Sequence, residues 1–199
     1  MRVKSHWFRD EAGKSATDVA SAAAFIVWRV AQNSLANMRK AGYELEPGPG
    51  YFAFLAEFLA FLVACADRIA YAKRDADWRL AFTTAVANRV GETLAGNMAD
   101  LIGADPAAAK RRFIELVNER AGDYAVHEWK ADGPTYGFLR AFGHTVAPTL
   151  AVDRDRRDSV AQVIEVEAPE AVETLQKAMA GLFGDAPRRA RRAAGATGE

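Results

Sequence analysis

Apolar residues recur along most of this chain with the spacing of one helix face, and few segments alternate with the period of two that marks a strand. Gly and Pro break the pattern near 42–50, 103–106, 132–134 and 148. Between these breaks it predicts helices over 15–41, 51–73, 76–102, 106–130, 135–147, 154–166 and 169–184. We therefore expect an all-α bundle of six to seven helices with short connections and no internal repeat.

Several expected helix ends carry local signals. Ser15 begins a sequence that is typical of a capping box, and Asp105 before Pro106 predicts an N-cap followed by proline in the first turn. Gly91 and Gly96 lie inside the third expected helix, where each glycine costs about 1 kcal/mol relative to alanine. Close approach of a neighbouring backbone would explain both glycines.

One expected helix, 51–73, is apolar on all sides. From Tyr51 to Ala66 the chain carries a single charge, that of Glu57. A membrane span usually needs about 18–20 uncharged residues, so this shorter run favours the central helix of a soluble bundle. Its aromatic residues, together with a neighbour, exceed what one flank of a helix could hide, which indicates a surface for a homodimer or another protein. They are Tyr51, Phe52, Phe54, Phe58, Phe61 and Trp78.

Composition and charge narrow the class of protein. The chain has 199 residues, half of them apolar, which is enough for one domain with a core. Its 26 basic and 26 acidic residues argue against a protein that binds duplex nucleic acid. Residues 185–199 hold four arginines and two acidic residues, so we expect a basic, disordered tail after a single domain over 1–184. The first residues lack an apolar stretch of signal-peptide length, so we expect a cytoplasmic location.

Reactive and metal-binding motifs are scarce in the sequence. The single cysteine, Cys65, lies in an apolar run where a thiol is inert, and it excludes an internal disulfide. A di-metal site of the ferritin type needs Glu three residues before His. Tyr124 and Ala141 stand at those positions before His127 and His144. We therefore expect no metal and no cofactor, and the sequence holds too few motif residues to name a family.

Four residues are candidates for binding a ligand. Steps of four, three and four residues lead from Glu57 through Phe61 and Ala64 to Arg68, so these residues share one helix face. A carboxylate inside an apolar helix either serves chemistry or pairs with an arginine from a neighbouring helix.

Tyr124 and His127 lie on the face of the fourth expected helix that points toward the core. Histidine at such a place can move a proton, or it can donate a hydrogen bond to a carbonyl or acidic group. Glu57, Arg68, Tyr124 and His127 are therefore the predicted ligand-binding residues, and no residue is assigned a catalytic role.

The sequence leaves two functions open. The first is an interaction or accessory protein that acts through self-association or a protein partner. The second is a binding module or enzyme that holds a small apolar or amphipathic ligand, or a cation, in a pocket beside helix 51–73. A cavity with one or two convergent polar groups would favour the second function. A solid core with a large apolar outer patch would favour the first.

Overall fold

The computed structural model describes residues 15–43, 45, 48–150 and 156–184. Its elements confirm the predicted all-α bundle, and the only strands among these residues are two strands of two residues each, which form one hairpin. The order is α1 (Ala16–Lys40), α2 (Pro49–Tyr71), α3 (Ala76–Ile102), α4 (Pro106–Ala125), β1 (Trp129–Lys130), β2 (Gly133–Pro134), α5 (Tyr136–Val146), a 3₁₀ turn (Ala147–Thr149), α6 (Arg156–Gln162), a π-helical segment (Val163–Glu167) and α7 (Ala168–Leu182). The tail expected over 185–199 lies outside the described residues.

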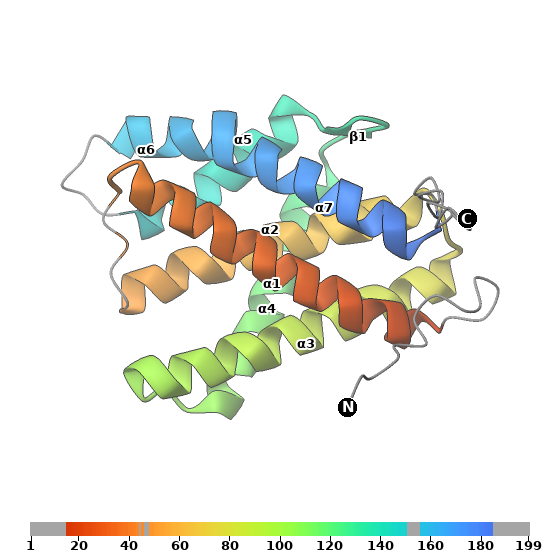
Figure 1. Ribbon diagram of the computed structural model, residues 1–199, viewed down its shortest axis with the longest axis horizontal. Coiled ribbons are helices and arrows are strands. Elements are labelled where there is room, and N and C mark those ends of the chain that lie inside the picture. The colour runs from red at the N-terminus through yellow and green to blue at the C-terminus, as the bar shows by residue number, and fades with distance from the viewer. Residues whose placement is uncertain (1–14, 44, 46–47, 151–155, 185–199) are drawn as a thin grey trace, which may run out of the picture.

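Helix α2 runs through the middle of the bundle. It packs against α1, α3, α4, α5 and α7, and Figure 1 shows α1 and α7 side by side in front of it. By length and composition α2 is also the one helix of the described residues that could cross a membrane. Most of α2 is buried by its neighbours, as is expected of the core helix of a bundle that is apolar on every side.

The predicted N-caps are present. Ser15 and Asp105 each accept the backbone N–H three residues later, at 3.2 and 2.6 Å. Asp75, which the sequence analysis did not single out, caps α3 in the same way at 2.9 Å. Gly103 ends α3 with φ of 67°, a left-handed conformation that favours glycine. The starts of α1, α3 and α4 are therefore stabilised by residues of the local sequence.

The close approach of a neighbouring backbone that was expected at the two glycines of α3 is found at neither, because the atoms nearest to Gly91 belong to side chains of α4. A Cβ at Gly91 would lie 3.0 Å from Cδ1 of Phe113, so Gly91 allows α3 and α4 to pack closely. A Cβ at Gly96 would have no neighbour within 4 Å, so the prediction of a close approach is wrong there.

Helix α4 ends at Ala125, although the sequence predicted a helix to 130. A hairpin follows, in which β1 pairs antiparallel with β2. The ring of Trp129 in this hairpin meets that of Phe138 edge-on, at 5.5 Å. The guanidinium of Arg68 donates to the carbonyl oxygen of Tyr124 at 3.0 Å, so α2 satisfies a carbonyl that a longer α4 would have used itself. A hydrogen bond from so distant a residue cannot be predicted from the local sequence.

The helices predicted over 154–166 and 169–184 join into one continuous run. Pro169 lacks an N–H, and its ring would clash with the carbonyl of residue 165 in a regular α-helix. The π-helical segment comes just before this proline and relieves the clash by widening the turn. Helix α5 packs directly on this segment, because a Cβ at Gly143 would lie 2.3 Å from Cδ1 of Ile164.

The π-helical segment ends on a buried carboxyl group, that of Glu167. Only 3% of this residue is exposed. Its Oε1 accepts a hydrogen bond from Nε2 of Gln162 at 3.3 Å, while Oε2 has no partner among the described residues. Burial raises the pKa of the Glu167 carboxyl group, and the charge of Glu170 acts in the same direction.

We expect Glu167→Gln to stabilise the fold more at about pH 7.5 than at about pH 4.5. The folded pKa lies above the unfolded one, so the unfolded chain loses its proton first as pH rises. The free energy of unfolding of the wild type therefore falls as pH rises from the unfolded pKa through the folded one. The glutamine side chain of the variant would stay neutral throughout and keep nearly the same shape.

Thermal melts of both proteins at the two pH values measure this effect. Glu165→Gln is the matched control, because Glu165 lies exposed on the same segment, and its effect should be small and similar at both pH values. A Glu167→Gln variant that is less stable than the wild type at the higher pH would show that the ionised carboxylate is a favourable part of the fold.

Candidate functional site: a cleft between three helices

A cleft of about 360 Å³ opens between α2, α3 and α4. Helix α2 contributes one face of its second half, and α3 and α4 contribute shorter stretches opposite. This volume falls in the range of about 300–1,000 Å³ that is typical of small-molecule sites. The α2 face consists of Ala60, Val63, Ala64, Asp67, Arg68 and Tyr71.

Small side chains make the cleft. Ala60 and Ala64 on α2 line it together with Ala121 and Ala125 on α4. Alanine has high helix propensity but fills little space, so two regular helices meet here without closing the gap between them. Val63 and Val117 complete the apolar wall.

An ion pair stands at the polar end of the cleft. Nε of Arg79 lies 3.1 Å from Oδ1 of Asp67, and the hydroxyl of Thr83 donates to the same oxygen at 2.7 Å. The Arg79 guanidinium also lies over the ring of Tyr71, 5.0 Å from its centroid. Asp67 and Arg79 therefore neutralise each other within the site.

The second cationic group of the cleft, Arg68, has a different set of partners. Its Nη2 donates to the carbonyl oxygen of Tyr124 at 3.0 Å, with those of Ala125 and His127 at 3.5 Å. Within the described part of the chain, no carboxylate lies within ion-pair distance of Arg68. Only the partial negative charge at the end of α4 balances this guanidinium.

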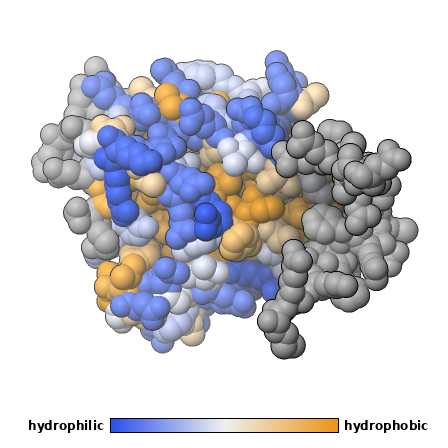
Figure 2. All heavy atoms as spheres, in the orientation of Figure 1, coloured by the Kyte–Doolittle hydropathy of each residue, from blue (hydrophilic) through white to orange (hydrophobic). Residues whose placement is uncertain are grey.

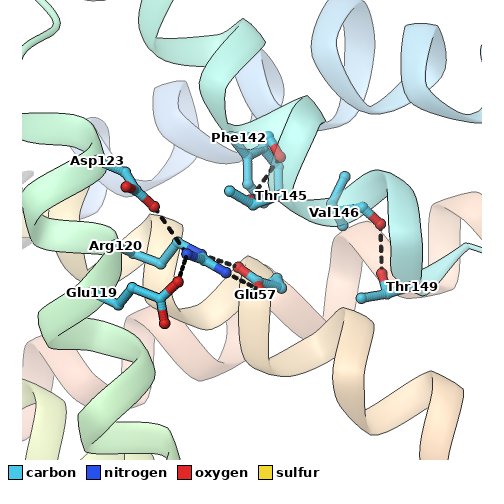
Figure 3. Close-up of polar contacts among 8 residues, drawn as sticks. All are labelled: Glu57, Glu119, Arg120, Asp123, Phe142, Thr145, Val146 and Thr149. Atoms are coloured by element: carbon cyan, nitrogen blue, oxygen red, sulfur yellow. Dashed lines mark hydrogen bonds and ion pairs between the residues drawn. The ribbon is translucent and has the colours of Figure 1, made fainter.

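Glu57 lies elsewhere, in a buried ion pair with α4. Nε and Nη2 of Arg120 donate to its two carboxylate oxygens at 2.7 and 2.8 Å, while Nη1 meets Glu119 and Asp123 at 2.7 and 2.9 Å (Figure 3). The hydrogen bond with Glu57 is the main cause that raises the pKa of the Arg120 guanidinium. Of the two roles expected for Glu57, the structure supports pairing with an arginine. About 16 Å of helix rise separates it from Arg68.

The structure brings together two of the four predicted ligand-binding residues. Arg68 and Tyr124 both line the cleft, whereas Glu57 does not. His127 contributes a backbone carbonyl, and its Nδ1 would lie 3.3 Å from a Cβ at Gly137 in α5. Sequence reasoning missed the polar residues Arg79 and Thr83 and the partner of Glu57, because all three come from helices whose packing the pattern does not give.

Tyr124 is part of the core as well as of the cleft wall. Its ring stacks on that of Phe138 at 4.8 Å, and 1% of the residue is exposed. The hydroxyl has no hydrogen-bond partner among the described residues, and burial raises its pKa. In Figure 3 the nearby hydroxyl of Thr145 is bonded instead to the carbonyl oxygen of Phe142, at 2.9 Å.

The aromatic residues behind the expected homodimer are mostly buried within one chain. Phe52, Phe54, Phe58 and Phe61 are each at most 2% exposed. Figure 2 shows an apolar area on the face that α1 and α7 occupy, bordered by polar side chains along part of its edge. The most exposed large apolar residues belong to several different elements; they are Phe25, Tyr71, Leu80, Leu101, Val126 and Tyr136. Self-association therefore stays a prediction, and the buried aromatic residues of α2 no longer support it.

Comparison of this chain with protein-family models, with curated proteins and with solved structures found no significant match.

Proposed function

We propose that this protein is a binding module that holds a small amphipathic molecule in the cleft between α2, α3 and α4. One observation carries the proposal: a cavity walled by alanine and valine ends at Arg68, which has no carboxylate partner among the described residues. Ligand sites usually combine apolar walls with a few polar groups that orient the ligand. The apolar body of the ligand would lie along the alanines, with its polar end at Arg68.

Binding fits this site better than catalysis. No histidine or cysteine lines the cleft, and Asp67, its one carboxylate, is held by Arg79 and Thr83. Cys65 is fully buried nearby in α2, and burial raises the pKa of its thiol well above the usual value. The side chains of the cleft therefore offer no activated nucleophile or free general base.

A neutral amphipath tests the cleft without involving charge. We expect 1-octanol to bind the wild type, and Ala64→Leu to weaken this binding at least tenfold because the larger side chain fills the cavity. Ala36→Leu is the matched control, since Ala36 is exposed on α1, outside the cleft, and its substitution should leave the affinity unchanged. Isothermal titration calorimetry measures the affinity, and circular dichroism checks that each variant is folded.

Two results would overturn the proposal. One is that the wild type binds neither 1-octanol nor a charged amphipath with the same apolar body. The other is equal binding by the wild type and a folded Ala64→Leu variant, which would place the alcohol elsewhere on the protein.

A further inference from the structure

We infer that the cleft selects a monoanion, a small carboxylic acid with an apolar body, and that Arg68 binds its carboxylate. This inference rests on the proposed binding function and adds the chemical class of the ligand. It depends on the charge balance of the cleft, on the free donors of Arg68 and on the groups that surround them.

The charge balance of the cleft leaves one positive charge. Three charged residues line the cleft: Asp67, Arg68 and Arg79. Asp67 and Arg79 form an ion pair at 3.1 Å, so their charges cancel locally. The charge of Arg68 remains, reduced by the partial negative charge of the carbonyls at the end of α4. A single negative charge on the ligand would complete the balance.

The donors of Arg68 suit a carboxylate. A guanidinium presents five N–H groups in a planar fork, which matches the two oxygens of a carboxylate. The protein carbonyls that Arg68 contacts all use Nη2. Its Nε and Nη1 have no acceptor within the described residues, so they keep N–H groups for a ligand. Arg68 is partly buried, and a charge-assisted pair is stronger there than in bulk water.

The surroundings of Arg68 disfavour other charges. A dianion such as a phosphate monoester would exceed the single balancing charge and meet Asp67 and the carbonyls of α4. A cation would meet the unpaired charge of Arg68 itself. A neutral amphipath would occupy the apolar part, but a head group such as a hydroxyl offers Arg68 one uncharged acceptor, which is a weaker partner than a carboxylate that accepts from two donors and carries the opposite charge. The monocarboxylate is the class that satisfies all of these groups.

A series with one apolar body and three head groups tests the inference. We expect octanoate to bind the wild type at least tenfold more tightly than 1-octanol, and octylammonium to bind more weakly than either. Arg68→Met should remove the preference for octanoate while leaving the affinity for 1-octanol within about threefold. Arg89→Met is the matched control, because Arg89 is exposed on α3 outside the cleft. Calorimetry at low and high salt should show the preference weakening with salt.

Arg68 also stabilises the end of α4, so a second variant keeps the test decisive if Arg68→Met fails to fold. Arg68→Lys retains the charge but lacks the fork, and it should bind octanoate more weakly than the wild type and more tightly than 1-octanol. Equal binding of octanoate and 1-octanol by the wild type would overturn this inference and leave the proposed function intact. Stronger binding of octylammonium would overturn it as well. Failure of all three probes to bind would overturn the proposed function itself.

Discussion

Replacing Arg120 with Met should lower the free energy of unfolding by about 3–5 kcal/mol, because it leaves the carboxylate of Glu57 buried without a cation. The side chains of Arg120 and Glu57 are only 14% and 10% exposed, and two short hydrogen bonds join them. Water has little access to either side chain, so it would not take the place of the lost guanidinium. The change also removes the cation that Glu119 and Asp123 share.

The reciprocal substitution, Glu57→Gln, should lower the free energy of unfolding by less than Arg120→Met does. In Glu57→Gln the guanidinium of Arg120 keeps its contacts with Glu119 and Asp123, so it is not left alone, and we expect a loss of about 1–3 kcal/mol. Once Arg120 is absent, Glu57→Gln should restore part of the lost stability, since it removes the uncompensated buried charge. The two substitutions should therefore be strongly non-additive.

Chemical denaturation of the two single variants and the double variant near pH 7 measures this coupling. Arg112→Met, an exposed position on the same helix, should change stability by no more than about 0.5 kcal/mol. If Arg120→Met costs no more than this control, the ion pair contributes nothing measurable to the fold.

The sequence predicted those parts of the fold that local residues determine. The starts of α1 and α4 depend on the caps Ser15 and Asp105, which act within one turn. The central position of α2 follows from its apolar composition, which calls for neighbours on every side. At the early end of α4 the carbonyl oxygen of Tyr124 accepts a hydrogen bond from Arg68, which comes from another helix, and the local sequence gives no sign of such a contact.

The residues of the candidate site likewise fall into those that the local sequence indicates and those that only the packing of the helices reveals. Arg68 was found because helical spacing puts it on the same face as Glu57, and Tyr124 because it lies with His127 on the core-facing side of the fourth expected helix. The cleft itself was not predicted, because alanine is common in helices and the sequence does not show that Ala64 and Ala121 line the same space between α2 and α4. The partner of Glu57 lies 63 residues along the chain, so only the packing of α2 on α4 reveals it.

The second large effect is expected in the core, where Phe61 joins α2 to α4 and α5. Its ring stacks on that of Phe142 at 4.2 Å with an interplanar angle of 16°. It also meets the rings of Tyr124 and Phe138 edge-on, at 6.1 and 5.9 Å. Phe61 is fully buried, so no solvent can fill the space that its removal would leave.

Phe61→Ala should therefore destabilise the protein by about 3–5 kcal/mol, the sum of lost burial and of a cavity that the packed rings cannot close. For a chain of this size that corresponds to a fall in Tm on the order of 10 °C. Phe25→Ala removes the same atoms from a side chain that is 65% exposed on α1, and it should shift Tm by only about a degree or two. Phe61→Leu should fall between them, because leucine restores part of the volume but none of the ring contacts. Melting curves that place Phe61→Ala beside Phe25→Ala would show that the stacked rings do not hold α5 against α2.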